Sequence, residues 1–169
     1  VVGGVIPTPL IPAVEKGVRQ LLDNGAFAGF PLQDLRVTGY DGKYHSVDSK
    51  EIAFVMAGRK AFLDAVSKAK PVVLEPIVDI EISAPSISMG DIAGDLSSRR
   101  GRVGSTDALP GSMILITGQV PLAEIDDYQS RLKSMTGGEG AYSVEFRSYE
   151  TAPAEVQKRL TDAFQHPEE

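Results

Sequence analysis

The spacing of apolar residues along the first 70 positions predicts two helices separated by an extended segment. Residues 10–23 carry apolar side chains at helical intervals and stop before Gly25, which favours the left-handed backbone that closes a helix. Residues 32–40 alternate in part between apolar and polar side chains and end at a turn over 41–42, which predicts a strand. An acidic capping box, Asp48 with Glu51, then predicts the start of a second helix that ends at about residue 68.

The predicted second helix has one apolar stripe, which we expect to be buried. Its members are Ile52, Val55, Phe62, Leu63 and Val66. Two prolines then bound residues 71–76, and each proline disfavours a helical conformation at the residue before it. Because the residues between them are apolar, we interpret 71–76 as a short packed connection between two domains.

The following residues alternate between strand and helix patterns in the order βαββαβ. The six elements are expected over residues 77–82, 88–101, 102–106, 113–120, 121–135 and 142–146. Ser88 is predicted to be the N-cap of the first of these helices, and Met89 to lie on its apolar stripe. This order over about 75 residues is that of the ferredoxin-like split βαβ unit.

These patterns predict an α+β protein of two small domains. The first is an incomplete domain over 1–70, the connection covers 71–76, and the ferredoxin-like domain covers 77–150. A C-terminal helix and tail follow over 151–169, with Val156, Leu160 and Phe164 on one side of the helix.

Composition excludes most kinds of catalytic site. The 169 residues include no cysteine and two histidines, so thiol chemistry is absent and a histidine base or ligand is scarce. No G-x-x-x-x-G-K-[ST] motif occurs, so we expect no nucleotide phosphate to bind to this chain. The sequence begins with valine in the middle of a pattern, and we interpret it as a fragment of a longer protein. It has neither a signal peptide nor a long apolar run, which predicts a cytoplasmic protein.

Charge is divided unevenly along the chain. Residues 1–75 hold nine basic and eight acidic residues, whereas residues 76–150 hold six basic and eleven acidic ones. Nucleic-acid binding depends on local lysine and arginine density, so any RNA contact made by the second part must be local.

Two small groups of residues are candidates for such contacts. Lys43, Tyr44 and His45 combine a cation, an aromatic ring and an imidazole in a predicted loop, a combination that meets RNA through phosphate attraction and base stacking. From the residues alone, a solvent-exposed turn histidine explains His45 as well. A second cluster consists of Arg99, Arg100 and Arg102, for which phosphate binding and helix capping remain equal alternatives.

Several longer strings resemble the bacterial elongation factor G family. The fourth domain of that family is similar to residues 4–7 (GVIP), 11–18 (IPAVEKGV), 28–31 (AGFP), 44–49 (YHSVDS) and 74–77 (LEPI). Its fifth domain is similar to residues 89–101 (MGDIAGDLSSRRG), 120–124 (VPLAE) and 134–142 (SMTGGEGAY). The resemblance runs in collinear order from about residue 4 to residue 153.

This resemblance implies a function in translation. Members of the family are GTPases that drive translocation of tRNA and mRNA on the ribosome, so GTP and magnesium would belong to the full-length parent and not to this fragment. The fourth domain is a ribosomal-protein-S5-like arm, of which the first strands are missing here, and its tip enters the decoding site of the small subunit. The tip would comprise Lys43, Tyr44, His45, Ser46 and Asp48.

The resemblance also implies a role for the second domain. In the family it docks beside the stalk base and the sarcin-ricin loop of large-subunit RNA, which favours RNA contact for the region of Arg99, Arg100 and Arg102. The resemblance implies no membrane partner, and ribosome docking favours a monomer. No catalytic, cofactor-binding or metal-binding residue is assigned to this chain.

Two other interpretations remain. A ribosome-protection or recycling-specialised paralogue would share both domains. A stand-alone enzyme on a ferredoxin-like scaffold is also conceivable, because that fold hosts many activities. Such an enzyme needs a cluster of titratable groups in a cleft. The only candidate base, His45, is on a predicted exposed turn, which argues against this interpretation.

Overall fold

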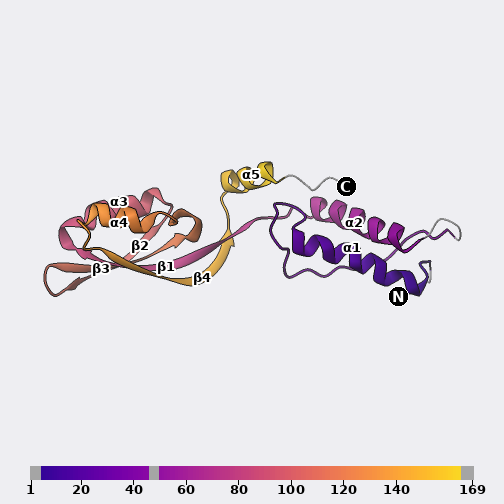
Figure 1. Ribbon diagram of the computed structural model, residues 1–169, viewed down its shortest axis with the longest axis horizontal. Helices are drawn as coiled ribbons and strands as arrows, with labels where there is room; N and C mark the ends of the chain where they lie inside the picture. Colours follow the sequence, from indigo (N-terminus) through magenta and orange to yellow (C-terminus); the bar gives the residue numbers. More distant parts are fainter. Residues whose placement is uncertain (1–4, 46–49, 165–169) are drawn as a thin grey trace. The chain divides into compact units, whose positions relative to one another are not determined.

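The computed structural model describes residues 5–45 and 50–164 of the chain. The chain forms two compact units, the first from residues 1–73 together with 153–169 and the second from residues 74–152. Both units are visible in Figure 1, where colour follows the sequence from indigo to yellow. The two units are described separately below, as unit 1 and unit 2.

Unit 1 is built on a pair of helices that lie side by side. A short 3-10 turn (Thr8–Leu10) leads into α1 (Ile11–Asn24), and α2 spans Glu51–Lys68. Figure 1 shows the two helices running next to each other. A third helix, α5 (Ala154–Ala163), returns to this unit from the C-terminal part of the chain, where the side chain of Gln157 accepts a 3.2 Å hydrogen bond from the backbone N–H of Val73.

Glycines allow α1 and α2 to approach closely. A Cβ atom on Gly58 would lie 2.7 Å from the carbonyl oxygen of Val14, and one on Gly17 would collide with the carbonyl oxygen of Val55. Both contacts are to backbone atoms, which cannot swing aside as the end of a side chain can. The helix pair therefore requires a residue without a side chain at each of these positions.

This contact determines which side of α2 is buried. The predicted helix is confirmed over Glu51–Lys68, and Val55, Phe62 and Val66 are buried as expected. Ile52 was predicted to be in the core and that prediction is wrong, since its side chain is 65% exposed while Phe54 is buried. The face of α2 that carries Gly58 is turned toward α1, which places Phe54 inside and Ile52 outside. The predicted capping residue Asp48 lies outside the described residues.

The predicted strand over residues 32–40 is not formed. These residues are largely exposed, and their backbone has no assigned strand or helix. A strand exists only when its N–H and C=O groups pair with a neighbouring strand. Among residues 5–45 and 50–164, all four strands belong to unit 2, so this segment has no strand partner in the part of the chain described.

Unit 2 is a four-stranded antiparallel sheet with helices on one face, as Figure 1 shows. The elements follow the order β1 (Leu74–Pro85), α3 (Met89–Ser98), β2 (Arg102–Leu109), β3 (Met113–Pro121), α4 (Tyr128–Met135) and β4 (Ala141–Thr151). Short 3-10 turns precede α3 (Ser86–Ser88) and α4 (Leu122–Glu124). The strand order is β2-β3-β1-β4, which is the expected ferredoxin-like βαββαβ arrangement. The prediction of an α+β protein is confirmed.

The core of unit 2 lies between the sheet and its two helices. The central strands β1 and β3 alternate between buried and less buried residues, as a sheet covered on one face requires. The helices contribute buried residues that include Ile92, Leu96, Tyr128 and Leu132. All of these belong to one continuous cluster with the inward residues of β1 and β3.

Four local predictions for unit 2 need correction. β1 begins at Leu74, within the span predicted as a connection. Its first residues, up to Pro76, pair only with β4, and its pairing with β3 starts at Ile77. The helix predicted from residue 121 begins at Tyr128, since a 3-10 turn and a bend come first. Ser88 does not cap α3 with its side chain; its hydroxyl donates to the carbonyl oxygen of Met135 at 3.2 Å. Met89 is exposed rather than part of the core.

No helix among the described residues is both long enough and apolar enough to cross a lipid bilayer.

Replacing Gly58 with alanine tests the close contact between the helices. We expect Gly58→Ala to lower the free energy of unfolding of unit 1 by about 2 kcal/mol, because the new methyl group must displace backbone atoms of α1. The matched control is Gly94→Ala in α3, where an added Cβ meets nothing within 4 Å and the better helix former should add about 0.5 to 1 kcal/mol. Urea unfolding monitored by circular dichroism measures both; equal effects of the two substitutions would contradict the account.

Candidate functional site

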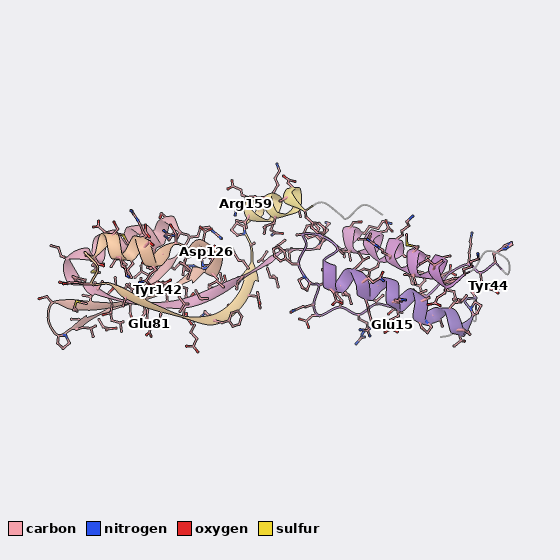
Figure 2. The ribbon with its side chains drawn as sticks, in the orientation of Figure 1. Glu15, Tyr44, Glu81, Asp126, Tyr142 and Arg159 are labelled. Carbon is pink, nitrogen blue, oxygen red and sulfur yellow. The ribbon has the colours of Figure 1, made fainter. Side chains whose placement is uncertain are left out.

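The predicted tip residues lie in the loop that precedes α2. Lys43, Tyr44 and His45 are all exposed, and Figure 2 shows Tyr44 in this loop, at one end of the helix pair. Tyr44 is 46% exposed, so part of its side chain is accessible. Ser46 and Asp48, the other two predicted tip residues, lie outside the described residues.

The turn predicted over residues 41–42 is not formed, since residues 35–45 have no assigned turn, helix or strand. The backbone N–H of Gly42 donates to the Asp41 carboxylate at 2.7 Å. A Cβ added to Gly42 would contact the end of the Ile6 side chain, which can move aside. Gly42 therefore lies next to the N-terminal segment of unit 1.

One exposed aromatic residue near the loop was missed by sequence analysis. Tyr40 is 93% exposed and stands directly before the Asp41-Gly42 pair, four positions from Tyr44. A tyrosine exposed to this degree is unusual, since aromatic rings normally bury most of their area. The available signal was its place next to an Asp-Gly pair, at the end of a segment wrongly predicted as a strand.

Unit 1 also contains an apolar groove of about 580 Å³ between α1 and residues 35–42. Its apolar lining includes Val14, Val18, Leu35 and Val37. Its charged lining residues are Glu15, Arg19 and Asp41, and the first two form a helix-surface ion pair of 2.7 Å, as their i, i+4 spacing suggests. This lining, drawn from the described residues, contains no serine, histidine or lysine, so it lacks the usual nucleophile and base pairs.

In unit 2, Arg99 is the C-cap residue of α3 and is engaged by acidic groups. Its Nε donates to Asp95 at 2.8 Å and one terminal nitrogen donates to Asp127 at 2.6 Å, and its side chain is only 15% exposed. These contacts, above all the hydrogen bond to Asp127, raise the pKa of Arg99 beyond its ordinary value and hold the pKa of the Asp127 carboxyl below its usual range. Arg99 therefore fastens α3 to the start of α4.

Arg100 forms a second set of ion pairs. Its two terminal nitrogens donate to the two carboxylate oxygens of Glu75 at 2.7 and 2.8 Å, and its Nε donates to Glu124 at 3.0 Å. The hydrogen bonds to Glu75 are the largest cause of a pKa raised beyond the ordinary arginine value. A bidentate guanidinium–carboxylate pair is among the strongest polar contacts in proteins, so this side chain is committed to the fold of unit 2.

Arg102 differs from both. Its side chain is 77% exposed, and its contact with Glu150, at 3.7 Å, is long. An exposed ion pair of this kind contributes little to stability, so the guanidinium remains accessible to a ligand. Of the three arginines in the predicted cluster, two are held by acidic groups of unit 2 and Arg102 faces solvent.

The described residues form no candidate metal site. Within 5–45 and 50–164, no three histidine or acidic side chains lie close enough together to hold a metal ion. The geometry consists of an exposed loop with aromatic and basic side chains in unit 1 and, in unit 2, Arg102, the one accessible arginine of the predicted cluster. Such surfaces can bind a polyanion.

Comparison with known proteins identifies the family. The family model for elongation factor G domain IV matches residues 1–70, and the model for the elongation factor G C-terminus matches residues 72–160. The chain belongs to the elongation factor G family. It is 42% identical over 162 residues to an elongation factor G-like protein of Thermotoga maritima, a match that covers 96% of this chain and 24% of that protein.

A solved structure supports the assignment. A crystal structure of a Thermus thermophilus protein superposes with a TM-score of 0.71 at 38% identity, covering 95% of this chain and 24% of the other. The chain thus spans about a quarter of the length of the two relatives. It corresponds to the C-terminal part of a translation elongation factor, and the resemblance noted in the sequence is confirmed.

The ring of Tyr128 faces the guanidinium of Arg99, so Tyr128 provides a test of the packing around the arginine cluster. Its ring is fully buried, 5.4 Å from the Arg99 guanidinium and edge-on to Tyr142, and among the described residues its hydroxyl has no hydrogen-bond partner. Burial raises its pKa to about 12. The folded state therefore favours the neutral phenol, and this contribution to stability is complete below about pH 10, the ordinary pKa of tyrosine, and lost as the pH rises toward 12.

We expect Tyr128→Phe to keep or raise the free energy of unfolding, by up to about 1 kcal/mol, because it removes a buried hydroxyl that is not hydrogen-bonded. The variant should also lose less stability than the wild type between pH 10 and 12. Urea unfolding at pH 8 and across the alkaline range measures both effects, with Tyr149→Phe at an exposed ring as the control. A loss of stability at pH 8 would show that the hydroxyl is bonded after all.

Proposed function

We propose that this chain is the ribosome-binding end of an elongation factor G that promotes GTP-driven translocation of tRNA and mRNA. The full-length protein would bind GTP and magnesium in a part that lies outside the two family matches. Residues of the present chain would contribute binding and no catalysis. The protein would act in the cytoplasm as a monomer, with no membrane partner.

In this proposal the loop before α2 enters the decoding site of the small subunit. The single observation that carries the proposal is this exposed loop, with Lys43, Tyr44 and His45 at the end of a braced helix pair in a family member. The lysine would attract phosphate and the rings would stack on bases, which is how proteins contact single-stranded or irregular RNA. Ser46 and Asp48 complete the proposed tip, and we add Tyr40 because of its exposure.

Unit 2 would contact large-subunit RNA near the stalk base and the sarcin-ricin loop. Of the predicted contact residues, Arg102 is the best candidate because its guanidinium is exposed. Arg99 and Arg100 hold acidic side chains of their own unit, and we propose that they support this surface without donating to phosphate. The excess of acidic residues over 76–150 agrees with a contact through a few local cations.

A second candidate function is that of a specialised paralogue, acting in ribosome protection or ribosome recycling. The observation that favours it is the name of the Thermotoga maritima relative, which is called elongation factor G-like. Such a protein would share both parts of the chain and would differ in what the loop does on the ribosome.

Replacing Tyr44 with alanine in the full-length protein tests the proposed tip. We expect single-round translocation, followed by fluorescence of labelled mRNA, to slow about tenfold, because one base-stacking contact is lost. Ribosome-stimulated GTP hydrolysis should stay at the wild-type rate. The matched control is Tyr149→Ala, which removes an exposed tyrosine from unit 2 and should leave translocation unchanged.

Two results would decide against parts of the proposal. Normal translocation by the Tyr44→Ala protein would remove the tip assignment. A wild-type protein that splits ribosomes or displaces a bound drug, but does not translocate, would favour the paralogue.

A further inference from the structure

The chain enters and leaves unit 2 at neighbouring positions of one strand ladder. Leu74, the first residue of β1, pairs with Thr151, the last residue of β4, and the next pair inward is Glu75 with Glu150. The unit boundaries fall directly outside this ladder end, after residue 73 and after residue 152. Whatever holds the last two pairs closed therefore determines how far strand pairing extends toward the unit boundary.

The paired residues themselves would not hold this end closed. Glu75 and Glu150 are directly opposite each other on adjacent antiparallel strands, and like charges in that arrangement repel. Glu75 is also buried, with only 9% of its surface exposed, so its charge is poorly screened by water. Ladder ends fray readily, and this one carries an additional electrostatic cost.

Arg100 offsets that cost from another part of the unit. It occupies both carboxylate oxygens of Glu75 and reaches Glu124 as well, so one guanidinium joins β1, the corner after α3 and the turn before α4. Its backbone is left-handed, with φ of 61°, at a helix C-terminus where glycine is the usual residue. Retaining an arginine there has a conformational cost, which the ion pairs with Glu75 and Glu124 compensate.

We propose that Arg100 is a clamp that keeps the entry and exit strands of unit 2 paired up to Leu74 and Thr151. With the charge of Glu75 offset by Arg100, the ladder closes to its last pair, next to the unit boundary. Without Arg100, β1 and β4 open from this end. This role belongs to the fold of unit 2 and does not depend on the proposed RNA contacts.

Amide hydrogen exchange in the complete 169-residue chain tests the clamp. Arg100→Gly removes the guanidinium while suiting the left-handed backbone, and Glu75→Gln removes the charge with little change of shape. We expect Arg100→Gly to raise exchange about tenfold at residues 74, 75, 77 and 148–151, because the repulsion between Glu75 and Glu150 is then no longer offset. Adding Glu75→Gln removes that repulsion, so the double variant should exchange at close to the wild-type rate. Residues 80–82 and 142–144, in the middle of the same strands, should exchange at the wild-type rate.

Two neighbouring arginines are the matched controls. Arg99→Gln removes an equally engaged guanidinium whose partners lie in α3, α4 and the turn between, and Arg102→Gln removes an exposed one with a long contact to Glu150. Neither should accelerate exchange at the ladder end. Unchanged exchange at this end in Arg100→Gly, or a double variant that exchanges as fast as Arg100→Gly alone, would overturn the proposal. An equal rise along the whole of β1 and β4, or the same rise with Arg99→Gln, would also overturn it, because each would show a general loss of stability.

Discussion

Unit 2 depends on the pairing of β1 on both of its edges. β3 pairs with it along nine residues from Ile77 to Pro85, and β4 pairs with it from Leu74 onward. Because β1 is central, its inward residues Val78, Ile80 and Ile82 are covered by α3 and α4, and they belong to the main core cluster. The order of the other strands and the positions of both helices follow from this one strand, as does the closeness of the two points at which the chain enters and leaves the unit.

Unit 1 depends on a different constraint, which is the distance between two helix backbones. Gly17 and Gly58 permit a contact that any side chain would prevent, and the contact fixes which face of α2 is buried. Lys43, Tyr44 and His45 follow Gly42, which is close to the side chain of Ile6.

Periodicity along the sequence was enough to predict most elements, because their apolar spacing is strong. It predicted α1, α2 and the βαββαβ order, but the turn that it predicted at residues 41–42 is not formed. It failed where the outcome depended on a distant partner: residues 32–40 have a strand pattern but no neighbouring strand among the described residues, and the burial of Phe54 follows from Gly17, far away in sequence. The partners of Arg99 and Arg100 could not be predicted for the same reason, since Glu75, Glu124 and Asp127 are about 25 residues away. The tip was predicted by resemblance, and geometry adds the exposure of Tyr40 and of the three described tip residues.

We propose that the exposed loop of unit 1 binds RNA, whereas Arg99 and Arg100 of unit 2 form ion pairs within their own unit. The most direct test is an electron cryomicroscopy structure of the full-length factor held on the ribosome with a non-hydrolysable GTP analogue. We predict that Lys43, Tyr44 and His45 lie within contact distance of small-subunit RNA at the decoding site, and that Arg100 remains paired with Glu75. A loop that faces solvent in that complex, or that lies against a site unrelated to decoding, would contradict the proposed RNA-binding role of the loop.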